Sequence, residues 1–447
     1  MAEPLVILQS RQDDWLGGID RQALIHLAQD RYQAIVQHPK KYPTILISEL
    51  EPLFFLASFV AASTARCPAF LANPGWAPSE WQQVFQQVHP DLIWGIVPPN
   101  FSQANFSQAN ALQIDAPPPT PGWIMIPTGG SSGKVRFAIH THETLSFSVM
   151  GFCKYFQIDQ VNSYCVLPLY HVSGLMQFLR SLFTQGKFVT SPFKSLDFTS
   201  VDPSIFFISL VPTQLQRLLQ RSSPELSQFQ TVLVGGAPAW TELLETARQQ
   251  QIRLAPTYGM TETASQIATL KPKDFLQGKT GSGQVLPHAH LSIADNGAIA
   301  IQSQSLALGY YPHLFSTPQF QTDDLGYFDA AEYLHLVGRS SQKIITGGEN
   351  VFPAEVEAAI RASGLVKDVY VLGLAEPHWG EMITAVYVPV NVKVTVLMIQ
   401  VFLNQELSKY KHPKQWMSVA KLPRNEQGKV NETVIRAKLL SFFEEKS

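Results

Sequence analysis

The stretch "WIMIPTGGSSGKVRFAIHT", residues 123–141, is a short apolar run that leads into glycines and hydroxyl residues and then into cations. Glycine tolerates the backbone angles that turn successive N–H groups toward an anion, and hydroxyls and a cation add charge-assisted hydrogen bonds. We therefore predict a strand followed by a phosphate-binding loop, with a flexible surface turn as the alternative. It is not a Walker A loop, because Val135 stands where that motif needs Ser or Thr.

The chain downstream of this stretch alternates between apolar runs and helical segments. Runs such as "SIFFISLVP" and "TVLVGGAP" are bounded by turn residues, which predicts a mixed or parallel α/β sheet. From about residue 279 to 337 the pattern is β-rich, with a hairpin turn at Asn296-Gly297. We predict an α/β fold with a large N-terminal domain of mixed α/β sheets and a β-rich subdomain over residues 1–338. A small mobile α+β domain would follow over residues 339–447, with "VTVLMIQVFLNQELSKY" as an amphipathic helix.

The composition excludes several classes of protein. The 33 basic and 35 acidic residues of the 447-residue chain leave no basic excess for nucleic acid. Three cysteines without a CxxC pair predict neither a disulfide framework nor a zinc site, and they favour a cytoplasmic location. The longest apolar run, residues 53–62, is far shorter than the roughly 20 residues that span a membrane, so we predict a buried helix and no membrane span.

Four further motifs carry side chains suited to nucleotide chemistry. They are "PTYGMTETASQ" (residues 256–266), "QTDDLGYFD" (321–329), "VGRSSQKIITGGENVFPAEVE" (337–357) and "LPRNEQGKV" (422–430). Together with the glycine-rich loop, and in this order, they resemble the adenylate-forming enzymes, the superfamily of acyl-CoA synthetases and peptide-synthetase adenylation domains. The resemblance implies an enzyme that uses ATP and Mg²⁺ to convert a carboxylic acid to an acyl-adenylate, and then transfers the acyl group to a thiol, often that of CoA.

The resemblance implies catalytic roles for three residues. Lys429, in the small domain, would swing in to stabilise the adenylation transition state, a task that suits a compact ammonium on a flexible stem. Thr261 would hydrogen-bond the α-phosphate, and Glu262 would bind Mg²⁺, which prefers carboxylate and phosphate oxygens. The alternative for Lys429 is one more solvated surface lysine.

The resemblance also implies a set of nucleotide-binding residues. Tyr258 would stack on adenine, Asp324 would accept hydrogen bonds from both ribose hydroxyls, and Arg339 would reach the ribose or a phosphate. The glycine-rich loop would hold the β- and γ-phosphates, with Arg136 in the place of the superfamily's lysine. The remaining members of the set are Thr128, Gly129, Gly130, Ser131, Ser132, Gly133, Gly235, Gly236, Ala237, Gly259 and Met260.

The connection between the two predicted domains has its own implied role. Ser341 maps to the hinge about which the small domain would rotate between the two half-reactions, and "GGEN" (residues 347–350) would help to form the thiolation site. Asp323 stands where the superfamily usually has glycine, and no role is predicted for it.

The segment "PLYHVSGLMQFLR" (residues 168–180) bears on the choice of acid, because it carries an arginine in an otherwise apolar helix. A buried arginine needs a carboxylate partner, either in the protein or on the substrate. With the "ASQI" that follows "TYGMTET", this segment resembles the 2-succinylbenzoate–CoA ligases of menaquinone and phylloquinone biosynthesis, whose substrate is an aromatic dicarboxylate. The resemblance implies substrate binding by His171, Ser173, Gln266 and Arg180, with Arg180 as the partner of the ring carboxylate.

Other functions stay open at this point. Another acyl- or aryl-CoA ligase, or an adenylation enzyme that loads a carrier protein, would use the same motifs. A nucleotide-binding module without catalysis is disfavoured by the presence of Lys429, Glu262 and Asp324. The histidines of "HTH" and "HAH" lack a nearby cysteine or carboxylate cluster, so we expect no metal there. The expected partners are the acid, ATP and CoA, and the sequence leaves the oligomeric state open.

Overall fold

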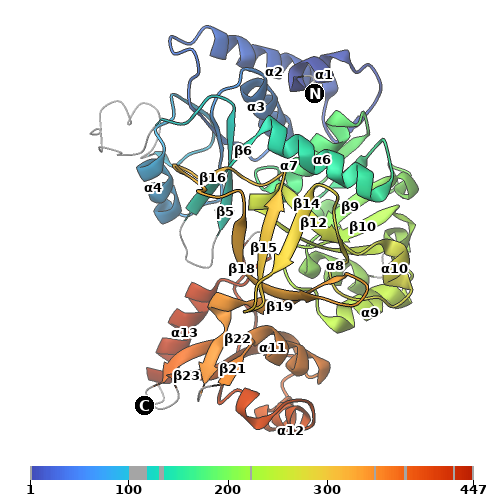
Figure 1. Cartoon of the computed structure of the whole chain (residues 1–447), viewed down its shortest axis with the longest axis vertical. Coiled ribbons are helices and arrows are strands. Elements are labelled where there is room, and N and C mark those ends of the chain that lie inside the picture. The colour runs from blue at the N-terminus through green and yellow to red at the C-terminus, as the bar shows by residue number, and fades with distance from the viewer. Residues whose placement is uncertain are drawn as a thin grey trace.

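The computed structural model describes residues 3–99, 118–129, 135–221, 224–346, 349–376, 380–425 and 428–444. Figure 1 shows a large upper body, coloured blue through yellow to light orange, and a smaller lower body in darker orange and red. Both bodies combine helices with sheets, so the predicted α/β fold is confirmed.

The first sheet of the large body is mixed. Among the described residues, its first six strands in spatial order pair in parallel, and the last two pair in antiparallel fashion. Among the described residues its order is β1 (Leu16–Gly17), β8 (Phe188–Thr190), β7 (Asn162–Cys165), β9 (Phe206–Leu210), β10 (Thr231–Val234), β11 (Leu254–Met260), β12 (Ser265–Thr269) and β13 (Gln284–Val285). This is the mixed sheet that the alternating pattern predicts, with the "TYGMTE" motif at the end of β11.

The second sheet carries the glycine-rich loop. Its order is β17 (His313–Leu314), β16 (Gly309–Tyr310), β6 (Val135–Thr141), β5 (Trp123–Gly129), β3 (Ala69–Leu71), β2 (Ile45–Ser48) and β4 (Leu92–Gly95). Strands β5 and β6 pair in antiparallel fashion, so the loop is the connection of a hairpin.

The helices of the large body pack on these sheets (Figure 1). They are α1 (Pro4–Ser10), α2 (Arg21–Val36), α3 (Pro52–Thr64), α4 (Pro78–Gln87), α6 (His142–Phe156), α7 (Val172–Phe183), α8 (Pro212–Gln220), α9 (Thr241–Gln249) and α10 (Pro272–Leu276). Helix α3 is buried on nearly all sides, as a helix apolar all round must be, which confirms the prediction for residues 53–62. Within the described part of the chain, no helix has the length and apolar character needed to cross a bilayer.

The β-rich segment forms a third sheet, which is antiparallel throughout. Its strands are β14 (Ala289–Ile293), β15 (Ala298–Ser303), β18 (Phe320–Phe328) and β19 (Leu334–Arg339). The predicted hairpin turn is present between β14 and β15. Gly297 has φ +82°, a conformation that favours glycine, and the side chain of Asn296 accepts a hydrogen bond from the Ala298 N–H at 3.1 Å.

The smaller body has its own sheet and apolar core. It contains β20 (Ile344–Thr346), β21 (Glu349–Val351), β22 (Val366–Glu376), β23 (Gly380–Pro389), β24 (Gln415–Ser418), α11 (Pro353–Ala362), α12 (Val396–Glu406) and α13 (Glu432–Glu444). The predicted domain boundary falls at the end of β19 and stays a prediction. Helix α12 is less amphipathic than predicted, because Leu397 and Val401 are exposed while Ile399 and Leu403 are buried.

Candidate active site

The glycine-rich loop is placed by the two strands that flank it. Thr128 on β5 lies opposite Arg136 on β6, and Gly129 ends β5. The guanidinium carbon of Arg136 lies 4.4 Å from the ring centroid of Tyr310. The other predicted members of the loop, Gly130, Ser131, Ser132 and Gly133, lie outside the described residues.

Glu262 lies in a single 3-10 turn, Thr261–Thr263, that follows β11 directly. Its side chain is buried, and its Oε1 accepts hydrogen bonds from Thr128 Oγ1 at 3.3 Å and Tyr310 Oη at 2.6 Å. In the described part of the chain no donor engages Oε2. A carboxylate with one oxygen held and the other free suits Mg²⁺, which usually binds one or two carboxylates together with substrate phosphates.

The main chain of Thr261 is held by His140. The His140 ring lies with Nε2 2.8 Å from the Thr261 carbonyl oxygen and Nδ1 3.1 Å from Thr144 Oγ1. Burial lowers the pKa of His140 to about 4, so the ring is neutral at neutral pH and donates one hydrogen to the carbonyl. The first histidine of "HTH" is therefore a support for the "TYGMTE" turn, and the described residues contain no cluster of three or more metal-ligating side chains.

Three predicted nucleotide-binding residues meet at Asp324. Tyr258 Oη donates to Asp324 Oδ2 at 2.9 Å, and Arg339 Nε donates to Oδ1 at 3.0 Å. Burial raises the pKa of Tyr258, and so does the negative charge of Asp324, so its hydroxyl stays a donor. A carboxylate offers about four lone pairs, so Asp324 can still accept from a ribose. The Tyr258 ring packs in an apolar cluster and its hydroxyl holds Asp324, and its stacking on adenine stays a prediction.

The predicted backbone contacts with adenine lie at the end of β10. Gly236 has φ +79°, and a β-carbon at Gly235 would lie 2.4 Å from Thr257 Oγ1, so this turn passes close to β11. Ala237 is exposed beside it. Gly259 passes as closely over Ser265, where a β-carbon would lie 2.1 Å from the carbonyl oxygen.

Lys429 lies in the smaller body, and its pKa depends on charged side chains of the large body. Burial lowers its pKa, and the positive charge of Arg339 lowers it further, while Glu262 and Asp324 act in the opposite direction. The charges of the side chains assigned to the metal and the ribose therefore act on Lys429. Its N–H donates to Asn425 Oδ1 at 2.9 Å, which closes the loop that presents it.

The loop that carries Lys429 rests directly on the large body. Gly428 has φ +75°, and a β-carbon there would lie 2.8 Å from Thr213 Oγ1 and 3.5 Å from Val211 Cγ2. Glycine is therefore needed at this position both for the backbone angle and for the close approach to the start of α8.

The predicted hinge residue, Ser341, has Asp323 as a partner, a residue for which the sequence predicts no role. The Ser341 N–H donates to Asp323 Oδ1 at 2.9 Å, and the Ser341 hydroxyl hydrogen-bonds Asp323 Oδ2. Both side chains are exposed. In the "GGEN" segment, Gly347 and Gly348 lie outside the described residues.

Arg180 on α7 is a deeply buried charge. It is only 2% exposed, its Nη2 donates to Ser265 Oγ at 3.2 Å and Gln266 Oε1 at 3.1 Å, and its guanidinium lies 4.2 Å from the ring centroid of Phe152. Its Nε has no acceptor, and no carboxylate among the described residues pairs with it. Burial lowers the pKa of Arg180 to about 10, which still leaves it cationic at neutral pH.

His288 shares this apolar region with Arg180. Burial lowers its pKa to about 4 and the charge of Arg180 adds to the effect, and neither ring nitrogen has a partner among the described residues. The structure therefore brings Gln266 and Arg180 together, as predicted, and adds an unpredicted polar side chain to them.

The other two predicted substrate residues lie at the start of α7. Burial lowers the pKa of His171 to about 4, followed by the charge of Lys429, so His171 lies on the side of the region that Lys429 reaches. Ser173 is partly buried in the first turn of α7, where its carbonyl accepts a hydrogen bond from Gln177 Nε2 at 2.8 Å.

Sequence reasoning missed Tyr310, His140 and His288 as members of the site. The histidines were weighed only as metal ligands, and Tyr310 lies outside the five motifs. A glycine followed by two tyrosines and a proline, residues 309–312, was the available signal for Tyr310.

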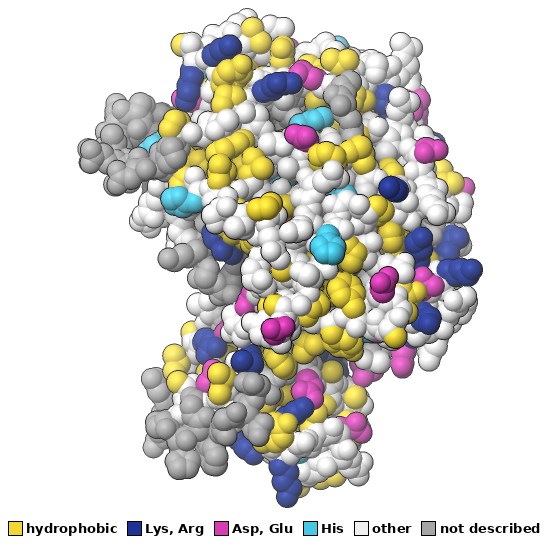
Figure 2. Space-filling model, viewed as in Figure 1, with side chains coloured by type: hydrophobic (Ala, Val, Ile, Leu, Met, Phe, Trp, Pro, Cys, Tyr) yellow, Lys and Arg dark blue, Asp and Glu magenta, His cyan; other side chains and the backbone are white. Residues whose placement is uncertain are grey.

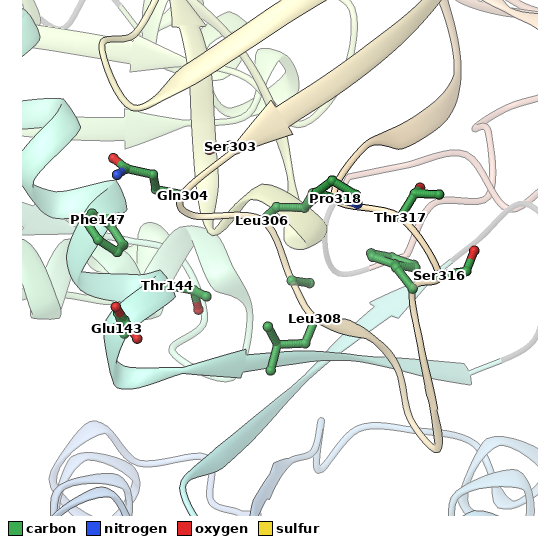
Figure 3. Close-up of a pocket in the computed structure, with 12 residues that line it drawn as sticks. Glu143, Thr144, Phe147, Ser303, Gln304, Leu306, Leu308, Ser316, Thr317 and Pro318 are labelled. Atoms are coloured by element: carbon green, nitrogen blue, oxygen red, sulfur yellow. The ribbon is translucent and has the colours of Figure 1, made fainter.

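A cavity of about 490 Å³ lies beside α6 and the segment that leads to Tyr310, and Figure 3 shows Glu143, Thr144 and Phe147 of α6 on one side of it and Ser303, Leu308 and Pro318 on the other. No described member of the predicted site lines it. On the face in Figure 2, basic side chains lie among acidic and neutral ones.

Two family models match this chain. The model described as AMP-binding enzyme matches residues 45–311, and the model described as AMP-binding enzyme C-terminal domain matches residues 355–429. The 2-succinylbenzoate–CoA ligase of Listeria monocytogenes serovar 1/2a is 33% identical over 320 residues, which cover 69% of this chain and 68% of that protein.

Solved structures of the o-succinylbenzoate CoA synthetase from Bacillus subtilis share the fold. The complex with the acyl-adenylate intermediate OSB-AMP has a TM-score of 0.82 at 23% identity, covering 96% of this chain and 97% of that one. The complex with ATP and magnesium ion has a TM-score of 0.80 at 23% identity, covering 96% and 98%.

Proposed function

We propose that this chain, which belongs to the AMP-binding enzyme family, is an ATP-dependent ligase that joins 2-succinylbenzoate to CoA, in menaquinone or phylloquinone biosynthesis. The observation that carries the choice of acid is Arg180, a buried cation whose counter-charge is absent from the described residues. A dicarboxylate with an aromatic ring supplies that counter-charge, and the ring suits the apolar surroundings of α7.

In the first half-reaction a carboxylate oxygen of the succinyl arm attacks the α-phosphorus of ATP, and the bond to pyrophosphate breaks as the acyl-adenylate forms. Both reactants are anions, so the site must supply positive charge and hold them in line. Lys429 and Arg136 are the cations for this task, and Thr261 donates to the α-phosphate. Asp324, with Tyr258 and Arg339 fixing its carboxylate, holds the ribose.

Glu262 would hold Mg²⁺ through Oε2, and the bound ion would neutralise phosphate charge. Thr128 and Tyr310 fix the other carboxylate oxygen, and His140 fixes the turn from which Glu262 projects.

In the second half-reaction the CoA sulfur attacks the acyl carbonyl carbon, and AMP leaves with the electron pair of the broken C–O bond. We propose that Ser341 is the hinge for the accompanying rotation of the smaller body, which comprises residues 339–447. The Asp323–Ser341 hydrogen bonds would then favour the arrangement in which Lys429 lies at the site.

Replacing Asp323 by Ala is expected to change the two half-reactions in opposite directions. Loss of two exposed hydrogen bonds weakens the adenylation arrangement by about 1 kcal/mol, so ATP–pyrophosphate exchange should fall about fivefold. Thioester formation from isolated acyl-adenylate should stay equal or rise. Asp329→Ala is the matched control, because Asp329 also accepts hydrogen bonds from nearby main chain but lies away from Ser341. Parallel loss of both half-reactions in Asp323→Ala would remove the hinge assignment.

The alkaline limb of adenylation is expected to lie below the usual range of lysine, because the pKa of Lys429 is lowered by burial and by Arg339. Only the protonated amine stabilises the transition state, so activity is lost as pH rises through that lowered pKa. The pH profile of kcat/KM for ATP, which reports the free enzyme, measures this. If the alkaline loss of activity occurs at the same pH in Lys429→Arg, a group other than Lys429 causes it.

The test of the proposed function is AMP release with CoA and a panel of acids: 2-succinylbenzoate, benzoates, cinnamates and short fatty acids. A clear preference for 2-succinylbenzoate is expected. Equal rates across the panel would exclude specificity for 2-succinylbenzoate. Another acyl- or aryl-CoA ligase, the alternative prediction from the sequence, would then be the better assignment. We also propose a cytoplasmic location, supported by the free thiols of Cys67, Cys153 and Cys165.

A further inference from the structure

Tyr310 contacts both a predicted metal ligand and a predicted phosphate ligand. It lies on β16, opposite Ala138 of β6, and its hydroxyl donates to Glu262 Oε1 at 2.6 Å. The guanidinium of Arg136 lies over the other part of the same side chain, 4.4 Å from the ring centroid. A hydrogen bond to a carboxylate and a cation over an aromatic face are both attractive, so one side chain holds two charged groups of opposite sign.

The segment that carries Tyr310 is fastened to the site on both sides. The Ala307 N–H donates to the Glu262 carbonyl at 2.7 Å, and the Leu308 N–H donates to the Ile139 carbonyl at 2.8 Å. Phe315 packs edge-to-face on the Tyr310 ring at 5.5 Å. Residues 307–310 therefore contact both the main chain and the side chain of Glu262.

The hydroxyl of Tyr310 carries one hydrogen. Its single hydrogen is committed to Glu262, and Oε2 of that carboxylate is left for a cation.

We propose that Tyr310 is a positioning residue. Its hydroxyl orients the Glu262 carboxylate to bind Mg²⁺, and its ring holds the Arg136 guanidinium where it can bind the phosphates. This proposal rests on the function proposed for Glu262, and it assigns the "LGYYP" segment (residues 308–312) to the nucleotide site, outside the five motifs.

Tyr310→Phe removes the hydroxyl and keeps the ring. The Mg²⁺ concentration for half-maximal ATP–pyrophosphate exchange is expected to rise about tenfold, because a hydrogen bond to a charged group is lost. Calorimetric titration of Mn²⁺ into enzyme saturated with a non-hydrolysable ATP analogue should show a similar loss of affinity without turnover. Tyr310→Leu removes the ring as well. It should additionally raise the KM for pyrophosphate, because the Arg136 guanidinium loses its contact with the aromatic ring.

The matched control is Tyr370→Phe. Tyr370 donates to Glu432 Oε2 at the same 2.6 Å, but within the smaller body, so the chemical change is equal and the metal dependence should stay that of the unaltered enzyme. Glu262→Gln separates the assignment of Glu262 to the metal from the role of Tyr310. If Glu262→Gln leaves Mn²⁺ binding intact, the metal assignment in the proposed function is wrong. If Glu262→Gln weakens it while Tyr310→Phe binds and titrates like Tyr370→Phe, the role of Tyr310 is wrong.

Discussion

Lys429→Ala is expected to lower acid-dependent ATP–pyrophosphate exchange about 10²- to 10³-fold, the size of effect seen when one group that stabilises transition-state charge is removed. Lys429 is a cation of the smaller body on which the charges of Glu262, Asp324 and Arg339 act. Its loss leaves the attacking carboxylate and the α-phosphate to repel each other. The measurement is isotope exchange between pyrophosphate and ATP at saturating acid.

The second half-reaction provides the internal control. Thioester formation from purified acyl-adenylate and CoA should keep its rate in Lys429→Ala, because adenylation is already complete. Lys421→Ala, a change to an exposed lysine of the same body, should alter neither half-reaction. Exchange at the unaltered rate in Lys429→Ala would contradict the catalytic assignment.

Arg180→Leu is expected to raise the KM for 2-succinylbenzoate about a hundredfold, while the KM for ATP stays unchanged. The substrate's ring carboxylate would enter an apolar region without a cation, and an unpaired buried charge of this kind costs several kcal/mol. Steady-state AMP release measures both constants. Arg180→Lys should lie between, because lysine keeps the charge but lacks the planar fork.

A thermal shift separates binding from folding. The melting temperature of the unaltered protein should rise with 2-succinylbenzoate, because a ligand that binds only the folded state stabilises it, and that of Arg180→Leu should not. An unchanged KM, or an equal thermal shift in the variant, would mean that Arg180 serves the packing of α7 against Phe152, Ser265 and Gln266 alone.

Local patterns in the sequence predicted the elements of the fold well. The all-round apolar run of residues 53–62 predicts a buried helix because no other surface would accept it, and Asn296-Gly297 predicts a hairpin because the turn needs positive φ. Helix α12 was less predictable, since Leu397 and Val401 are exposed although a helix packed on one face usually turns polar residues outward.

The candidate site was predictable where a motif carries it and not where the fold assembles it. Lys429, Glu262 and Asp324 each lie in a motif, and the structure gathers them. Tyr310 and His140 act through contacts with residues far away in the sequence, so only the packing of the fold brings them to their partners. Asp323 lies in a motif, but its contact with Ser341 depends on the pairing of β18 with β19. The hydroxyl of Tyr258 is a further case, because the motif indicates an aromatic ring and leaves its hydrogen bond undetermined.

Recognition of an aromatic dicarboxylate through Arg180 is tested most directly by comparing kcat/KM in AMP release for 2-succinylbenzoate and for 4-oxo-4-phenylbutanoate. The second acid has the same succinyl arm and ring but lacks the ring carboxylate. We expect a preference of about a hundredfold for 2-succinylbenzoate that falls to near one in Arg180→Leu. Equal kcat/KM values for the two acids in the unaltered enzyme would contradict it.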